Sequence, residues 1–315
     1  MSDFNLAIEK KEEIDGIIDN RMSNSIARLN KTSKSAEKTE LYHYSDTKGF
    51  QGIISSQKIW ATHYNHTNDP TEITLADEII KAKLKSGVAD QSLYFDSKSP
   101  VNGFGKLGSI QRSVYIASFS IKNNLLSQWR AYADDGNGFS LGLDLMNNKN
   151  ISRGYSEANK NKWFLIKVVY EEEDQKKLIQ EAIGDFMEVN KDFLKFENNN
   201  EKEFIKHTFQ SSLNFLCQLI PLFIKNMHYS EEEEWRLARF CYDINVKESK
   251  FREGRTSLIP YLEFDFAENG STLPLKEIVC GPKHDFDKSK RALEMFLKKE
   301  KVENVQITES DIPYR

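Results

Sequence analysis

Residues 41–63, LYHYSDTKGFQGIISSQKIWATH, decide the fold class, because they contain a strand, a helix and a second strand in succession. The two ends, LYHYS and KIWATH, are short and rich in aromatic or β-branched residues, as is typical of strands. Between them, Phe50, Ile53 and Ile54 recur at helical spacing, which predicts a helix over residues 48–56. This unit indicates a sheet with helices packed against it.

Strands and helices of uneven length continue to alternate along the rest of the chain. Patterns of apolar residues and turn residues predict further helices over residues 70–84, 125–133 and 289–300. They predict further strands over residues 113–120, 139–145, 163–170, 234–242, 257–266, 275–281 and 304–310. No glycine-rich phosphate fingerprint follows any strand, which argues against a Rossmann fold. The sequence therefore predicts an α+β fold with a mixed sheet.

The chain divides into an N-terminal helix, a linker and one main domain. Apolar residues recur mostly at helical spacing over residues 1–30, which predicts an amphipathic helix. Its apolar stripe needs a partner, either the main domain or another protein, including a second copy of this chain. Residues 31–40 carry almost no apolar side chain and are predicted to be a linker, so the main domain spans residues 41–315. Residues 171–229 lack strand patterns and are predicted to form a helical insertion outside the sheet.

Composition restricts the class of protein. The 315 residues are 39% hydrophobic and 29% charged, which is typical of a globular protein. The net charge of -4 disfavours tight nonspecific binding to nucleic acid. The longest apolar stretch, residues 213–224, is too short to cross a bilayer. Three cysteines without CxxC spacing indicate buried thiols in a reducing compartment, so we expect a cytoplasmic protein.

The first candidate site lies in the strand LYHYS. Strand alternation places His43 and Ser45 on one face and Tyr42 and Tyr44 on the other. The side chains of His43 and Ser45 could hydrogen-bond a ribose or an amide. A histidine whose hydrogen bonds are satisfied by a partner in the core is the alternative.

The second candidate site lies in LSQWRAYADDGNG, residues 126–138. Trp129 and Tyr132 could stack on a flat ring, and Arg130 between them supplies a hydrogen-bond donor. Because Trp129 and Tyr132 stand three residues apart on a predicted helix, they could instead form its core face.

The third candidate site lies in SEEEEWRLARF, residues 230–240. Most acidic runs are solvated surface. Here Glu232, Glu234 and Arg236 share one face of a predicted strand, and Glu234 adjoins its apolar pattern. A carboxylate at the start of a strand could stabilise a sugar oxocarbenium ion. Solvated surface is the alternative.

A fourth motif, HYNHTND, could supply metal ligands from His63, His66 and Asp69 and so support a metal hydrolase. This spacing has little specificity, and a surface loop followed by a helix cap is the alternative. We therefore predict no metal.

Several of these motifs occur together in one known family. The chain resembles a bacterial domain-of-unknown-function family, number 2971, in LYHYS, IWATHYNHTNDPTE, YIASFS, LSQWRAYADDGNGFSLGLD, EEEEWRL, IPYLEFDF and LKEIVCGP, which occur in the same order. This resemblance covers residues 41–315 apart from the helical segment. That family is in turn similar to the ADP-ribosyltransferase superfamily, whose members use a strand histidine, an aromatic residue and a strand glutamate.

The second resemblance implies a split β-sheet, mixed or antiparallel, with surrounding helices, and NAD as co-substrate without a metal. The catalytic residues that it implies are His43, Tyr132 and Glu234. The residues that it implies for NAD binding are His43, Ser45, Trp60, Trp129, Arg130 and Tyr132. Glu232 and Arg236 would then face the acceptor. The aromatic role could instead belong to Tyr115, Trp129 or Trp60.

The activity implied is transfer of ADP-ribose from NAD to an unknown protein or nucleic acid, or hydrolysis of NAD. Proteins of this kind commonly act as toxins or phage-defence effectors. The alternative is a non-catalytic module that binds a nucleotide or engages a partner through its N-terminal helix.

Overall fold

The computed structural model describes most of the main domain and parts of the segments around it. The described residues are 40–66, 112–152, 163–187, 220–242, 248–254, 257–267 and 272–314, with parts of 12–29, 75–82 and 209–219. The described residues between 12 and 29 are helical, and Leu29 is buried in one cluster with side chains of the main domain. Of the predicted linker, only Glu40 is described, and it begins the first strand.

The first three elements confirm the predicted strand-helix-strand unit: β1 (Glu40–Ser45), α2 (Thr47–Ser56) and β2 (Lys58–His63). Asp46 caps α2, because its carboxylate accepts a hydrogen bond from the Gly49 amide at 2.6 Å. The helix ends at Gln57, whose φ of 55° is left-handed and turns the chain into β2.

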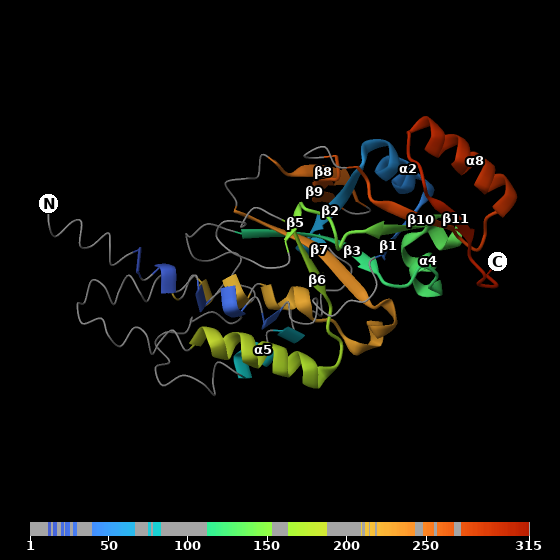
Figure 1. The fold of residues 1–315 in the computed structure, drawn as a ribbon. Coiled ribbons are helices and arrows are strands. Elements are labelled where there is room, and N and C mark those ends of the chain that lie inside the picture. Colours follow the sequence, from blue (N-terminus) through green and yellow to red (C-terminus); the bar gives the residue numbers. More distant parts are fainter. Residues whose placement is uncertain are drawn as a thin grey trace, which may run out of the picture.

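One sheet contains all eleven strands of the described chain (Figure 1). The other strands are β3 (Arg112–Ser120), β4 (Phe139–Asp144), β5 (Ile151–Ser152), β6 (Trp163–Lys167), β7 (Glu234–Tyr242), β8 (Lys250–Glu253), β9 (Leu258–Asp265), β10 (Leu275–Cys280) and β11 (Gln306–Glu309). The main strand order is β11-β10-β4-β1-β3-β2-β9-β8. A second branch, β7-β6-β5, pairs with β3 through β7. The pairs β5–β6 and β10–β11 are parallel and the others antiparallel, so the predicted mixed sheet is confirmed.

The sheet forks at β3. One edge of β3 pairs with β7 along all nine residues of the strand. The other edge is shared, because it pairs with β1 at Ser120 and with β2 at Ile116 and Tyr115. Ser118 lies between these two attachments. Since one strand edge can hold only one partner at each position, β1 and β2 separate beside Ser118.

Strand register assigns side chains to two faces of the sheet, because successive side chains alternate. Tyr42 lies opposite Ser120, and Ser120 lies opposite Glu234, so these three share one face, which we call the glutamate face. His43 and Phe119 lie on the other face, with their ring centroids 5.4 Å apart. We call this the histidine face.

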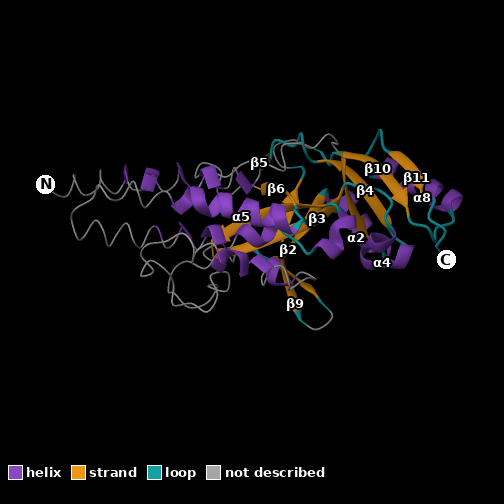
Figure 2. Cartoon of the chain, turned by 90° about the horizontal axis from the view of Figure 1, so that it is seen from below, coloured by secondary structure: helices purple, strands orange, loops and turns teal. Residues whose placement is uncertain are grey.

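Helices cover both faces. On the glutamate face, α5 (Glu172–Met187) packs against β3, β6 and β7, and α4 (Leu126–Tyr132) packs against β1. On the histidine face, α2 and α8 (Phe286–Lys299) contribute to a second core with strands of both branches. In Figure 1, α2 and α8 lie above β1 and β10, and α5 lies below β6. Figure 2, seen from below, shows α5 lying across the strands.

The predicted helical insertion, residues 171–229, forms part of the core. Its described residues include α5 and two 3-10 helices, η6 (Ile220–Phe223) and the start of η7 (Met227–Glu232), and none lies in a strand of the sheet. Ile183 and Phe186 of α5 are buried in one cluster with Ile116 of β3 and Phe240 of β7. The segment therefore covers the glutamate face, and its removal would expose that face to water.

Candidate functional site

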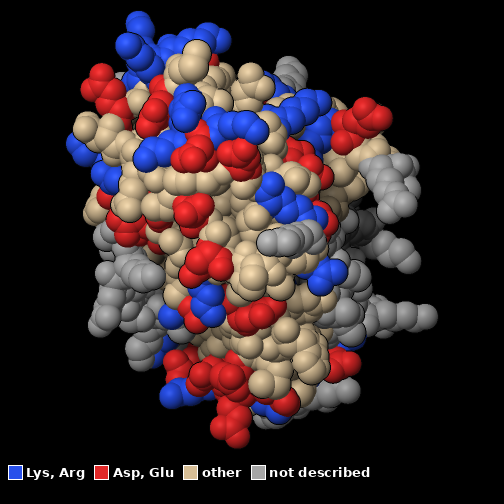
Figure 3. Space-filling model, turned by 90° about the vertical axis from the view of Figure 1, so that its right-hand side faces the viewer, with Lys and Arg blue, Asp and Glu red and all other residues tan. Residues whose placement is uncertain are grey.

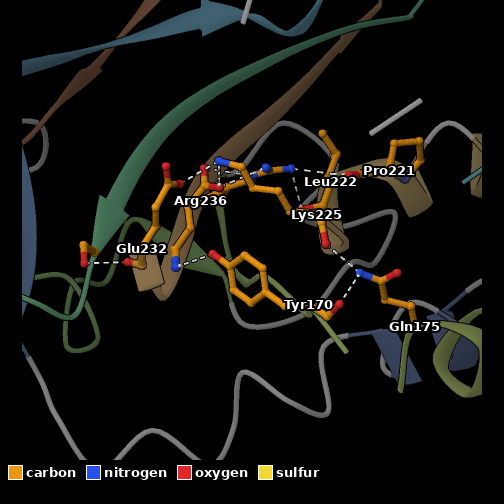
Figure 4. A network of polar contacts seen from close by, with 9 residues as sticks. Tyr170, Gln175, Pro221, Leu222, Lys225, Glu232 and Arg236 are labelled. Carbon is orange, nitrogen blue, oxygen red and sulfur yellow. Dashed lines mark hydrogen bonds and ion pairs between the residues drawn. The ribbon is translucent and has the colours of Figure 1, made fainter. Parts of the chain in front are cut away.

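Four charged side chains meet where β7 begins: Lys225, Glu232, Glu234 and Arg236, which we call the charge cluster (Figure 4). Glu234 is 5% exposed and Arg236 is 1% exposed, so the alternative of solvated surface does not apply to them. Arg236 donates from Nε to Glu234 Oε1 and from Nη2 to Glu234 Oε2, both at 3.0 Å. This two-point contact fixes the orientation of the carboxylate.

Lys225 joins the two glutamates. Its Nζ lies 2.7 Å from Glu232 Oε2 and 3.1 Å from Glu234 Oε2. The Lys225 carbonyl accepts a hydrogen bond from Gln175 of α5 at 2.7 Å, and the Tyr170 hydroxyl accepts one from the Glu234 amide at 2.9 Å. The charge cluster thus ties the segment after η6 to the sheet and to α5.

Each charge in this cluster is balanced by an opposite one. Burial raises the pKa of Glu234, but the nearby charges of Arg236 and Lys225 outweigh burial and lower the pKa to about 2. Burial lowers the pKa of Lys225, but the two glutamates outweigh it and raise the pKa. Burial also raises the pKa of Glu232. Glu234 is therefore ionised at neutral pH in a site shielded from water.

His43 forms a hydrogen bond with the Ser118 carbonyl where the sheet forks. Its Nδ1 lies 3.0 Å from the Ser118 carbonyl, which can only accept, so Nδ1 carries the proton and donates. Burial lowers the pKa of His43, and the hydrogen bond to Ser118 opposes this only in part. The ring is therefore neutral at neutral pH. The side chain is half-buried and one ring nitrogen has a hydrogen-bond partner, which is close to the alternative of a satisfied histidine.

The predicted site residues lie on two faces. Ser118 joins the two sides, since its carbonyl accepts from His43 and its hydroxyl hydrogen-bonds Glu234. His43 and Ser45 point to the histidine face, where a Cβ added at Gly49 of α2 would collide with the Ser45 hydroxyl. His43 and Glu234 therefore both contact Ser118, but they do so from opposite faces of the sheet and do not share a cleft.

The residues predicted on α4 belong to the glutamate face but differ in exposure. Trp129 is fully buried, packs edge-on against Tyr44 at 4.9 Å and donates from Nε1 to Asn124 at 2.8 Å. Its geometry is that of a core residue, which was the alternative. Tyr132 is 40% exposed and Arg130 is exposed.

Trp60 of β2 is 48% exposed on the glutamate face. Its ring packs against that of Tyr261 of β9, with centroids 4.5 Å apart and planes tilted by 31°. Tyr115, the other aromatic candidate, is buried on the histidine face and its hydroxyl contacts Ser249 at 2.7 Å. Of the aromatic candidates, Trp60 and Tyr132 therefore keep accessible ring surface.

The metal motif is only partly described. The rings of His63 and His66 lie 6.0 Å apart, and Asp69 falls outside the described residues. Within the part of the chain that the structure describes, no group of three or more His, Cys, Asp or Glu residues could hold a metal ion. No described helix is long and apolar enough to cross a membrane. Cys217, Cys241 and Cys280 are buried free thiols, as predicted.

A groove of about 480 Å³ lies between α8 and β11. Lysines gather on this side of the molecule, at the top of Figure 3, where α8 runs, and acidic side chains lie among them. The lining includes Lys290, Lys298 and Lys301 but also Glu294 and Glu303. None of the predicted site residues lines this groove, so it forms no part of the candidate site.

Three residues of the site were not predicted: Lys225, Tyr170 and Ser118. Lys225 directly follows the apolar stretch 213–224, and a lone lysine at the end of such a run is a signal that could have identified it. Tyr170 and Ser118 carry no such signal, because their roles depend on contacts across the sheet.

The comparisons with known proteins support the first resemblance. The model of the family DUF2971, described as a protein of unknown function, matches residues 128–237. The match begins in α4, includes the helical segment and ends just after Arg236, so it contains the charge cluster. It is narrower than the range suggested by the motifs. No curated protein and no solved structure matches the chain.

Proposed function

We propose that the protein cleaves NAD and transfers its ADP-ribose to an acceptor or to water, with NAD bound at the fork of the sheet on the glutamate face. One observation carries the proposal: Glu234, an ionised carboxylate, shares that face and that end of β3 with Trp60 and α4. The resemblance of the motifs to ADP-ribosyltransferases supports it, because those enzymes combine a strand glutamate with aromatic side chains.

The reaction needs a negative charge near the ribose. The bond between ribose C1′ and the nicotinamide nitrogen breaks, its electron pair leaves with neutral nicotinamide, and positive charge develops on the ribose. A nucleophile of the acceptor, or water, then bonds to C1′ and loses a proton. A fixed carboxylate stabilises the positive charge, and such electrostatic stabilisation is worth about a hundredfold to a thousandfold in rate.

The charge cluster sets a condition on this reaction. Both oxygens of Glu234 already accept from Arg236, and Oε2 also contacts Lys225. For Glu234 to bind a ribose hydroxyl, Lys225 must turn toward Glu232 alone. His43 lies on the other face, so in this proposal it is a positioning residue that orients Ser118 beside Glu234.

The test is release of nicotinamide from labelled NAD in the presence of cell extract, with the label sorted among protein, DNA, RNA and free ADP-ribose. We expect Glu234→Gln to reduce release at least a hundredfold. Glu232→Gln is the matched control, because it removes a carboxylate bound to the same lysine and should affect acceptor transfer more than NAD hydrolysis. Both variants must be compared at a temperature where circular dichroism shows them folded. Wild-type protein that releases no nicotinamide with any extract would exclude the activity.

A second candidate function is recognition of a nucleotide or partner without chemistry. The complete set of partners around Glu234 favours it, because a buried carboxylate bound by Arg236 and Lys225 can serve structure alone. This candidate predicts that NAD raises the melting temperature but is not turned over.

A further inference from the structure

The glutamate face of the branch β2-β9-β8 carries an aromatic platform. Trp60 lies opposite Glu263 and Thr62 lies opposite Tyr261, so the side chains of Trp60 and Tyr261 are on one face. Their rings pack against each other with centroids 4.5 Å apart and planes tilted by 31°. The tryptophan ring is half exposed, while Tyr261 is buried beneath it. A rigid ring with one open surface is the usual partner for a flat, conjugated ligand.

Arg252 of β8 lies beside this platform. Its Nη2 donates to Thr62 Oγ1 at 3.0 Å, so the side chain reaches across β9 toward β2. Its Nε is buried without a hydrogen-bond partner, and Arg252 makes no ion pair with any described residue. A half-buried guanidinium without a carboxylate is matched to an anion, and its planar fork suits a phosphate.

The other charges on this face are already paired. Glu263 contacts Lys58 at 3.2 Å and Lys250 at 2.9 Å, and Lys58 also contacts Asp265 at 3.1 Å. These two lysines and two carboxylates balance one another. Arg252 is therefore the unbalanced charge among the described residues around the platform.

We infer that Trp60 and Arg252 bind a nucleoside monophosphate group, with the base stacked on Trp60 and the phosphate on Arg252. The identity of this group rests on the proposed function, because it would be the adenylate half of NAD. Continuing the register of Thr62 opposite Ile116 places Trp60 level with Ser118, two strands and two residues from Glu234. Because β2 leaves β3 beside Ser118, strand spacing of about 4.8 Å and rise of about 3.4 Å give a separation of at least about 12 Å, a length that an extended dinucleotide can span.

Tryptophan fluorescence tests this directly. The other three tryptophans, Trp129, Trp163 and Trp235, are buried, so a ligand on the platform quenches chiefly Trp60. We expect AMP to quench the emission, and to bind at least tenfold more tightly than adenosine because adenosine lacks the phosphate. Arg252→Gln should abolish this preference, whereas Arg252→Lys should keep part of it.

A pair of exposed aromatic positions supplies the matched control. Trp60→Leu should weaken AMP binding about tenfold or more, as measured by calorimetry. Phe251→Leu on the opposite face of the same branch should leave it unchanged. Wild-type fluorescence insensitive to AMP, or unchanged affinity in Trp60→Leu, would overturn the inference. Binding of oligo-deoxyadenylate much tighter than AMP would also overturn it, by assigning the platform to nucleic acid.

The outcomes separate this inference from the proposed function. If AMP binds at Trp60 but no nicotinamide is released from NAD, the result supports nucleotide binding at the platform and excludes the NAD-cleaving activity. If nicotinamide is released while AMP leaves Trp60 unaffected, the activity stands and the platform falls.

Discussion

The charge cluster and the aromatic platform lie on the same face of one sheet, yet they differ in what they leave unsatisfied. In the cluster, Glu234 and Arg236 are almost fully buried and each carboxylate oxygen has a partner. In the platform, Trp60 is half exposed and Arg252 has no acidic partner among the described residues. A ligand could therefore reach Glu234 only after Lys225 moves away from it, whereas the ring of Trp60 is already accessible.

This difference predicts how substitutions in the two regions affect the stability of the fold. A buried pair gains little net stability, but losing one partner leaves an uncompensated charge and is costly. An exposed stacked ring contributes little to folding and can be changed at small cost. Substitutions in the charge cluster should therefore reduce stability strongly. Substitutions in the platform should reduce ligand binding with little effect on stability.

The largest effect on stability is expected for Arg236→Met. The variant leaves Glu234 buried with Lys225 as its remaining cation and removes the donor to the carbonyls of Pro221 and Leu222. We expect the free energy of unfolding, measured with urea, to fall by about 3–5 kcal/mol. The double variant Arg236→Met, Glu234→Leu should recover part of this loss. A loss below about 1 kcal/mol in the single variant would contradict the structural role of the cluster.

The second prediction concerns pH. The pKa of Glu234 is about 2 in the folded protein against an ordinary 4.5, so its contribution is complete above pH 4.5 and is lost as the pH falls toward 2. The contribution is about 3 kcal/mol. Because the pKa of Glu232 is raised, the folded state takes up a proton there before the unfolded state does, so Glu232 contributes with the opposite sign and mainly above pH 4.5. Urea unfolding at several pH values should show a steeper loss for the wild type than for Glu234→Gln. Equal slopes would refute the assignment.

A smaller effect is expected at the fork. His43→Leu removes the donor to the Ser118 carbonyl where β1 and β2 separate, and leaving that carbonyl unpaired should cost about 1–3 kcal/mol. His43→Asn places an amide N–H near the position of Nδ1 and should cost less. If both variants unfold at the same urea concentration, the hydrogen bond is not what His43 supplies to stability.

The smallest effect on stability is expected for Trp60→Leu. Because half of the ring is exposed, we expect the free energy of unfolding to change by less than about 1 kcal/mol. Thermal unfolding by circular dichroism measures this. A loss comparable to that of Arg236→Met would mean that the platform is part of the core, and the contrast between the two regions would disappear.

Much of the fold could be predicted from local patterns. The helix 48–56, the strand that begins at Glu234 and the helix near residues 289–300 were predicted within a few residues. Two strands were missed, β5 with two residues and β8 with four, because such short edge strands show no readable alternation. The missed strand β8 carries Arg252, so its position beside Trp60 could not be predicted.

For the candidate site, the sequence by itself determined which residues carry chemistry and on which strand face each lies relative to its neighbours. It placed Glu234 and Arg236 together on one strand, and His43 and Ser45 together on another, because alternation along a strand is a local property. The prediction that Glu232 shares this strand face is wrong, because Glu232 ends η7 and the left-handed Glu233 separates it from β7. Only the tertiary structure decided that Glu234 is buried and that His43 lies on the opposite face. Both outcomes depend on the register across β3 and on the packing of residues 220–232, which join positions far apart in the chain.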